Sequence, residues 1–469
     1  MQAHFALVDI LLLAGYFGFT LFVGFRSRVR TTDDFMIASR SLSLPVFVAT
    51  LVATWYGGIL AVGEFTYQAG LANWTTQGLP YYLFALIYAF FLASKVRGAS
   101  AYTIPDRITA TFGRPAGLIA ALFAFIMVTP APYILMAGQI VSIAFGWPLL
   151  PSLLLGTVFS MVYVYVGGFE SDIRINVFQF LLMFAGFAFG LGTLMLKFGG
   201  FGWLSSHLPP AHLTLTGGQD SGFILVWFFI ALLTLVDPGF HQRCSAAKNP
   251  SVAKWGIVAA VGCWAIFDFL TTSTGLYAKA ALPNLTEAQQ PFAFPLLAEA
   301  ALPPFVKGIF YIAMLATVMS TVVSYTFMGA MTVGRDFLWR LRDEEHNENV
   351  PRYTRIGLTL ATGLGIVIAI AVPSVVKQWF AIGTVFVPGL LLPLLACYYP
   401  MLRIHPALNL VAMVGGTGSA LGCLVTGWIK HGLTAETVQF PFHTQPMYAG
   451  LGFAVVVWGV GLALRPGTR

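Results

Sequence analysis

Long apolar runs separated by short polar loops extend along the whole chain, and thirteen of these runs are long enough to cross a membrane as helices. They lie near residues 5–25, 44–71, 74–96, 115–146, 148–168, 172–197, 222–241, 252–279, 305–335, 354–373, 378–399, 407–429 and 446–464. About 20 apolar residues span the hydrocarbon core of a bilayer. The pattern predicts an all-α integral membrane protein that forms one transmembrane domain, residues 1–469.

Composition agrees with this class. Hydrophobic residues make up 58% of the chain and charged residues 9%, against roughly 45–50% and about 25% in soluble domains. With the N-terminus outside, the cytoplasmic loops hold twenty of the 25 lysines and arginines. This bias predicts an N-out/C-in, multi-pass protein of the cell (plasma or inner) membrane. Attraction to an anionic inner leaflet explains the net charge of +7, so no nucleic-acid partner is expected.

The second apolar run, residues 44–71, is interrupted near its middle by Gly57 and Gly58. Paired glycines weaken the hydrogen-bond ladder of a helix. Where a membrane helix opens, freed carbonyl oxygens near Ala53 and Tyr56 suit a small cation such as sodium. Glycines in membrane helices also serve close packing, and this run alone does not separate the two interpretations.

A second polar feature lies in the ninth run, where four hydroxyl residues recur at spacings of three and four: Thr317, Ser320, Thr321 and Ser324. Such a spacing places them on one stripe of a helix. Hydroxyls in membrane helices commonly bond the carbonyl one turn earlier. A carbonyl has a second lone pair, so the Thr317 carbonyl could still bind an ion beside the hydroxyls of Ser320 and Thr321.

Seven segments between about residues 33 and 340 carry a resemblance to a known family. They read DDFMIASRSLSLPVFVATLVATWYGG, GEFTYQAGL, AYTIPDRITATFGRP, YILMAGQIV, VYVYVGGFESDIRINVFQ, HQRCSAAKNP and LATVMSTVVSYTFMGAMTVGRDF. Together they resemble the sodium:solute symporter family, which includes sodium/glucose, sodium/proline and sodium/pantothenate carriers. The resemblance implies a LeuT-type fold of two inverted five-helix repeats.

The expected repeats occupy residues 44–200 and 222–400. Residues 1–43 would add a first span with its inner loop, and residues 401–469 two peripheral spans. In such folds the ligands lie near the midplane of the membrane, beside discontinuous helices.

The resemblance also implies a set of sodium ligands. These are the carbonyls of Ala53, Tyr56 and Thr317 and the hydroxyls of Ser320 and Thr321. Na+ is then the coupling ion, and no organic cofactor is expected. Many members carry a "TD-xx-Q" aspartate linked to a second cation.

Here Asn176 replaces that acid, while Gln179 and Ser324 remain. Asn176 and Ser324 are therefore candidates for a second-ion site, but we infer that one sodium is coupled.

The solute pocket implied by related carriers is lined by five residues: Trp55, Gly57, Gln139, Ile230 and Leu233. Trp55 replaces the polar residue that sugar and proline carriers use at this position. An aromatic residue there suits a flat or hydrophobic solute or a gate, so the sequence leaves the chemical class of the solute open.

Three acidic residues fall well inside the runs. Ionisable residues inside membrane spans are rare and usually functional, so each of the three is a candidate functional residue. Glu64 lies eight residues beyond the break, roughly 12 Å outward, and is expected at the outer vestibule. Asp237 is expected to form a structural or gating ion pair with Arg243. Asp268 could hold a cationic group, replace the charge missing at Asn176, or remain neutral among nearby hydroxyls.

The sequence therefore predicts a sodium-coupled secondary active symporter that imports a small organic solute by alternating access. It is expected to be a monomer or a weak homo-oligomer in the lipid bilayer. A proton-coupled or uniporter-like carrier is an alternative, favoured by Asn176 and Asp268. A non-transporting membrane sensor is another. An enzyme is not expected, because the runs hold no His/Glu metal pattern and no Ser/His/Asp set.

Overall fold

The computed structural model describes residues 3–26, 31–99, 101–342, 349–432 and 440–465. Across these ranges the chain forms helices and no strand, apart from an isolated bridge between Leu42 and Ala247. The predicted all-α fold is confirmed.

Eleven helical stretches in the described ranges are long and apolar enough to cross a membrane. They are α1 (Leu7–Phe25); Trp74–Gly98, made of η2 (Trp74–Gly78), α5 (Leu79–Ile87), η3 (Tyr88–Ala93) and α6 (Ser94–Gly98); Arg114–Phe145, made of α8 (Arg114–Met127) and α9 (Ala131–Phe145); α11 (Val164–Phe198); Ser221–Ala246, made of α13 (Ser221–Ile230), α14 (Leu233–Val236) and α15 (Pro238–Ala246); α16 (Pro250–Ala281); Val306–Trp339, made of α18 (Val306–Met331) and η6 (Thr332–Trp339); α20 (Val350–Ala371); α21 (Val375–Tyr398); α22 (Pro406–His431); and α23 (Pro446–Ala463).

A twelfth span results if α3 (Leu44–Trp55) and α4 (Ile59–Ala69) are counted as one bent helix. The shorter apolar helix α10 (Leu149–Met161) corresponds to the fifth predicted run. The count of thirteen spans, the N-out orientation and the repeat boundaries stay predictions. The remaining helices are α2 (Thr32–Ile37), η1 (Ala38–Arg40), α7 (Ile104–Phe112), α12 (Phe201–His207), η4 (Pro210–Leu213), η5 (Glu287–Phe292), α17 (Ala293–Ala301), α19 (Arg340–Arg342), η8 (Pro400–Leu402) and η9 (Pro441–His443).

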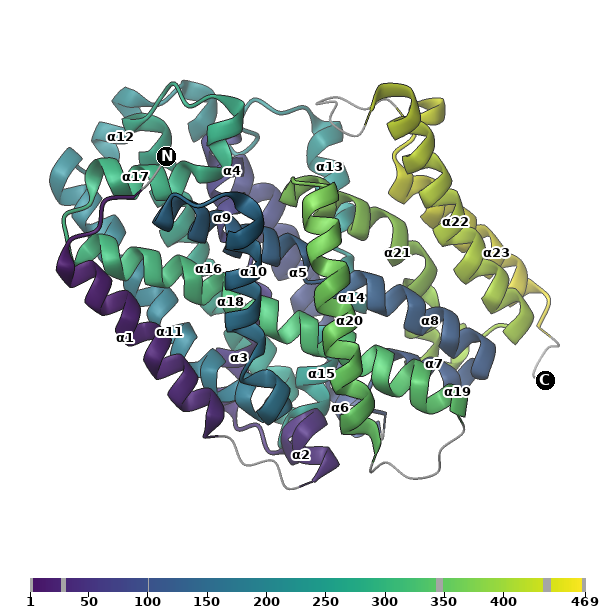
Figure 1. The fold of residues 1–469 in the computed structure, drawn as a ribbon. Helices are drawn as coiled ribbons and strands as arrows, with labels where there is room; N and C mark the ends of the chain where they lie inside the picture. The colour runs from purple at the N-terminus through teal and green to yellow at the C-terminus, as the bar shows by residue number, and fades with distance from the viewer. Residues whose placement is uncertain (1–2, 27–30, 100, 343–348, 433–439, 466–469) are drawn as a thin grey trace.

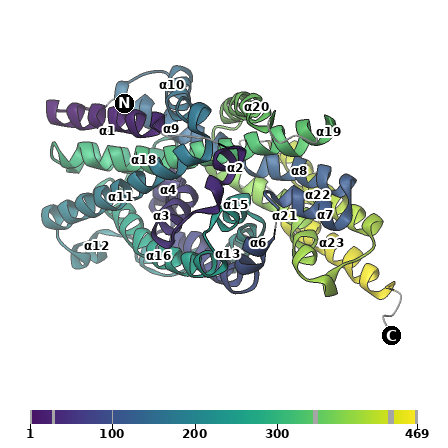
Figure 2. The ribbon, with the colours of Figure 1, turned by 90° about the horizontal axis from the view of Figure 1, so that it is seen from below.

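Helix α18 forms the centre of the molecule. Of the apolar part of Val306–Trp339, the stretch that α18 begins, 89% is buried, whereas the corresponding value for α1 is 22%. Helix α18 packs along α11 and also contacts α1, α3, α9 and α20. Figures 1 and 2 show α1 at one edge of the molecule and α22 with α23 at the opposite edge. The apolar surface of α18 is thus covered by protein, and that of α1 largely faces outward.

Small residues let α11 approach α18 closely, as is typical of membrane helix pairs. A Cβ atom at Gly186 of α11 would lie 2.4 Å from the Cβ of Ala313 and 2.8 Å from the carbonyl oxygen of Ile309. Neither neighbour is the far end of a flexible side chain. Any larger side chain at Gly186 must therefore push the two helices apart.

The break between α3 and α4 is confirmed, with a bend of 61°. Helix α3 ends at Trp55, and α4 begins at Ile59. A Cβ atom at Gly57 would lie 2.1 Å from the Oγ1 atom of Thr321. Glycine is required here because the backbone at the break lies directly against α18.

We expect Gly186→Val to lower the unfolding temperature of the purified protein, because overpacking at a helix contact costs about 1–3 kcal/mol. The matched control is Gly192→Val on the same helix, since a Cβ at Gly192 has no neighbour within 4 Å. Thermal unfolding of both variants in one detergent provides the measurement. Equal unfolding temperatures would show that the α11–α18 contact is not tightly packed.

Candidate functional site

Two hydroxyls of α18 cross over to the carbonyl groups at the end of α3. The Ser320 hydroxyl lies 2.8 Å from the carbonyl oxygens of both Ala53 and Thr317. The Thr321 hydroxyl donates to the carbonyl oxygen of Thr54 at 2.7 Å. Thr317 itself bonds back to Ala313 at 2.7 Å. The hydroxyl stripe of α18 therefore bonds to carbonyls of α3 as well as to carbonyls of its own helix.

The structure brings together four of the five expected sodium ligands, namely Ala53, Thr317, Ser320 and Thr321, all of them buried. The fifth, Tyr56, follows directly after α3, and its backbone angles are no longer helical (φ −87°, ψ 19°). Carbonyl and hydroxyl oxygens are hard and carry no formal charge. The donor set therefore fits a monovalent cation such as sodium, and the described residues contain no cluster of three or more His, Cys, Asp or Glu that would hold a metal ion.

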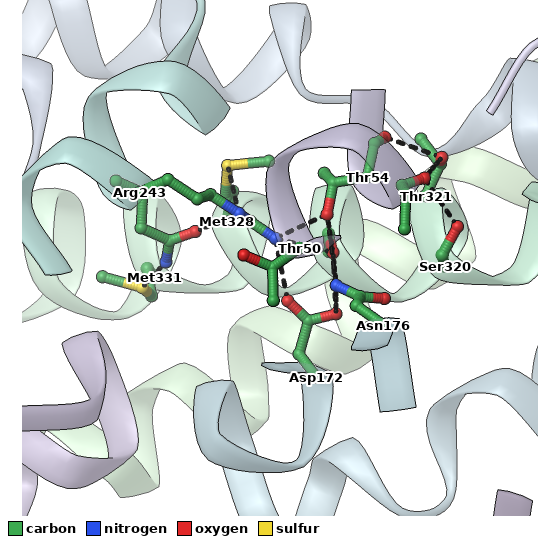
Figure 3. Close-up of polar contacts among 12 residues, drawn as sticks. Thr50, Thr54, Asp172, Asn176, Arg243, Ser320, Thr321, Met328 and Met331 are labelled. Atoms are coloured by element: carbon green, nitrogen blue, oxygen red, sulfur yellow. Dashed lines mark hydrogen bonds and ion pairs between the residues drawn. The ribbon is translucent and has the colours of Figure 1, made fainter. Parts of the chain in front are cut away.

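A buried ion pair lies on the other side of Thr54, as Figure 3 shows. Arg243 Nη2 lies 2.9 Å from Asp172 Oδ2, and both side chains are 0% exposed. The same Nη2 donates to Thr54 Oγ1 at 2.7 Å and to Ser324 Oγ at 2.9 Å. Arg243 thus places a positive charge beside Thr54 in the buried interior.

Asn176 and Ser324, the candidates for a second-ion site, do lie side by side. Asn176 Nδ2 is 3.2 Å from Ser324 Oγ and 3.0 Å from Asp172 Oδ1. Ser324 Oγ also donates to Asp172 Oδ1 at 2.7 Å. The cation among these groups is the guanidinium of Arg243.

The predicted ion pair between Asp237 and Arg243 is wrong. Asp237 instead accepts the backbone N–H of Phe240 at 2.9 Å, as the N-cap of α15, and the hydroxyl of Tyr325 at 3.0 Å. These donors satisfy both of its oxygens, which leaves Arg243 to pair with Asp172.

The sequence predicted three acidic residues inside the membrane spans, which was too few, because Asp172 is fully buried in α11. The sequence does contain a pattern that points to Asp172. Asp172 lies four residues before Asn176 and hence on the same face of the helix.

A cavity lies beside the break, with a volume of about 990 Å³ that includes its open mouth. Its lining contains four of the six residues proposed for the solute: Trp55, Ile230, Leu233 and Asp268. Gly57 and Gln139 are not part of the lining. Gly57 faces Thr321, and the Oε1 atom of Gln139 is buried without a partner among the described residues.

Further aromatic side chains, none of them predicted from the sequence to face the solute, complete the cavity wall. They are Tyr56, which was expected only as a carbonyl ligand of sodium, and Tyr81, Tyr82, Tyr133, Trp264, Tyr325 and Trp379. Beyond the break itself, these rings come from α5, α9, α16, α18 and α21. No local pattern marks them, because only the tertiary fold places these helices around one space.

Asp268 reaches the cavity from α16 and is 5% exposed. The hydroxyls of Tyr56 and Tyr82 donate to its two carboxylate oxygens. The Tyr56 hydroxyl also lies 2.8 Å from Thr271 Oγ1. The acid beside Asn176 is Asp172, so Asp268 does not replace the charge missing there. Glu64 on α4 is partly buried, and its vestibule role stays a prediction.

The sequence of this chain matches a known protein family. The model of the sodium:solute symporter family matches residues 35–400. The sodium/glucose cotransporter of Vibrio parahaemolyticus is 25% identical over 360 residues, which cover 68% of this chain and 66% of the relative. The sodium/pantothenate symporter of Escherichia coli K12 is 24% identical over 404 residues, or 79% of this chain and 80% of the relative.

The fold is shared with a solved structure, a Na+-coupled sialic acid symporter in a substrate-bound outward-open state. The TM-score is 0.78 and the sequence identity 16%, over 99% of this chain and 100% of that one. Together with further LeuT-fold neighbours, this confirms the predicted LeuT-type fold.

We expect Asp172→Asn to destabilise the protein by about 3–5 kcal/mol, because it leaves the Arg243 guanidinium buried without a counter-charge. The control is Glu170→Gln on the same helix, which removes a partly exposed pair with Arg174 and should cost about 0–1 kcal/mol. Thermal unfolding of both variants tests this. Equal stability of the two would show that the buried pair does not hold α11 and α15 together.

Proposed function

Because the chain belongs to the sodium:solute symporter family, we propose that it imports a small organic solute across the cell membrane together with sodium, by alternating access. The family consists of multi-pass membrane transporters and not of enzymes, as the sequence analysis predicts. The observation that carries the proposal is the contact between the hydroxyls of Ser320 and Thr321 and the carbonyls of the broken helix.

Sodium would be held by the carbonyls of Ala53, Tyr56 and Thr317 and the hydroxyls of Ser320 and Thr321. Without an ion, these hydroxyls donate hydrogen bonds to the carbonyls of Ala53 and Thr54. If the hydroxyl and carbonyl oxygens both directed lone pairs at an ion, the hydrogen bonds between them would break. The ion would then bridge α3 and α18 in place of those bonds. Bound sodium therefore stabilises one arrangement of the two helices over the other.

Tyr56 would connect the sodium site to the solute cavity. Its carbonyl belongs to the proposed ligand set, and its side chain lines the cavity and donates to Asp268. A change in the backbone at the break therefore moves a group that lines the cavity. This provides a short physical route by which the ion and the solute affect each other's binding.

One sodium per cycle is the expected stoichiometry. The guanidinium of Arg243 lies where Asp172, Ser324 and Asn176 converge, and it bonds two of these groups directly. A second sodium at this place would meet a fixed positive charge. The membrane potential supplies about 2.3 kcal/mol per charge per 100 mV to import of the single coupled ion.

A proton-coupled or uniporter-like carrier is the second candidate, and the observation that favours it is Asp268 in the cavity between two tyrosine hydroxyls. Such a group could take up and release a proton. Solute uptake that does not change when potassium replaces sodium would favour this candidate over sodium symport. Sodium binding without any solute flux would favour a membrane sensor.

We expect Thr321→Val to weaken sodium binding by about 10- to 100-fold, because it removes one oxygen that coordinates the ion and such a contact to a charged group is worth about 1.5–3 kcal/mol. The control is Thr326→Val on the same helix, because among the described residues Thr326 bonds to its own helix alone, at Val322. The measurement is the sodium concentration that gives half-maximal thermal stabilisation, with potassium keeping the ionic strength constant. Equal sodium dependence of the two variants would remove Thr321 from the site.

We also expect sodium binding to the wild-type protein to follow a Hill coefficient near 1, because Arg243 excludes a second ion. Equilibrium binding of radioactive sodium to the purified protein provides the measurement. A coefficient approaching 2, or two sodium ions bound per chain, would contradict the role given to Arg243.

A further inference from the structure

The lining of the cavity is acidic. Among the described residues, its lining contains two acidic side chains, Asp237 and Asp268, and no lysine or arginine. Asp237 is the N-cap of α15, where the helix dipole and the Phe240 amide stabilise it. Asp268 has only tyrosine hydroxyls on its carboxylate and forms no ion pair with any described residue. The charge at Asp268 is therefore available to a ligand.

The carboxyl group of Asp268 accepts a hydrogen bond on each oxygen, from Tyr56 at Oδ1 and from Tyr82 at Oδ2. Such donors favour the ionised form of a carboxyl group. A buried carboxylate without a counter-cation is costly inside a membrane protein. A positively charged ligand would remove this cost, whereas an anion would raise it.

The aromatic walls of the cavity also suit a positively charged ligand. Trp55 lies with its ring centroid 5.0 Å from that of Trp264 and 5.2 Å from that of Tyr81. Tyr133 and Trp379 form another neighbouring pair, with centroids 6.4 Å apart. The face of an aromatic ring attracts an ammonium group within about 6 Å, and a cluster of rings binds quaternary ammonium groups without hydrogen bonds.

We propose that the solute is an organic cation, a quaternary ammonium or protonated amine, whose charged head lies between these aromatic rings and Asp268. The inference rests on the proposed sodium symport and names the solute class of the same cavity. A few polar atoms remain for the rest of such a solute. Gln77 Nε2, Thr129 Oγ1 and Trp264 Nε1 line the cavity and are buried without a partner among the described residues.

The test compares ligands of one shape and different charge on the full-length purified protein in sodium. The probes are choline, its uncharged isostere with carbon in place of nitrogen, and the anionic carboxylate of that carbon skeleton, together with tetramethylammonium and propylamine as further cations. Thermal stabilisation and quenching of tryptophan fluorescence both report binding, since Trp55, Trp264 and Trp379 line the cavity. We expect a response to one or more cations and none to the uncharged and anionic isosteres.

Variants identify the groups responsible. We expect Asp268→Asn to weaken cation binding at least about tenfold, because it removes the partner charge, while Glu170→Gln should leave it unchanged. If Asp268→Asn does not fold, Trp264→Leu and Trp264→Phe replace it. Binding should weaken about tenfold in the leucine variant and much less in the phenylalanine variant, which keeps a ring.

The same preparation distinguishes a failure of the solute assignment from a failure of sodium symport. Sodium that stabilises the protein while no cation binds, or while only the uncharged or anionic isostere binds, overturns the solute assignment and leaves sodium symport standing. Cation binding that is unchanged by both Asp268→Asn and Trp264→Leu also overturns it. Sodium that fails to stabilise the wild-type protein counts against the proposed function itself.

Discussion

The contact between the broken end of α3 and the central helix α18 is the constraint on which the rest of the structure depends. Gly57 brings the backbone so close to Thr321 that no side chain fits between them. The hydroxyls of Ser320 and Thr321 then satisfy carbonyls that the break has taken out of the helix ladder. In the membrane interior these carbonyls have no water to bond, so α18 has to supply partners for them.

Residues 53–56 connect three features that would otherwise be separate. The Ala53 and Thr54 carbonyls contact the hydroxyls of α18, and the Thr54 side chain bonds Arg243. The Tyr56 side chain lines the cavity and donates to Asp268. A movement of this short segment therefore changes the proposed ion site, the buried ion pair and the solute cavity together. Coupling between ion and solute needs two states of such a shared element, and this segment is the candidate.

Local patterns in the sequence were sufficient for the all-helical membrane class, the break and the hydroxyl stripe, because each depends on residues a few positions apart. The Asp172–Arg243 pair joins residues 71 positions apart, and spacing along the chain gives no measure of their distance in space. Asp237 was assigned to Arg243 for their closeness in sequence, yet it caps α15 instead. The rings of the cavity come from α3 and from five further helices that are distant in sequence, which explains why Tyr82 was not predicted. Gln139 was predicted from related carriers, and it lies outside the lining.

A structure of the purified protein determined in saturating sodium tests the central claim most directly, with a potassium preparation as the reference. We expect an ion bounded by the carbonyls of Ala53, Tyr56 and Thr317 and the hydroxyls of Ser320 and Thr321, with Ser320 no longer donating to Ala53. An ion held elsewhere, while both hydroxyls still donate to the carbonyls of α3, would contradict the account.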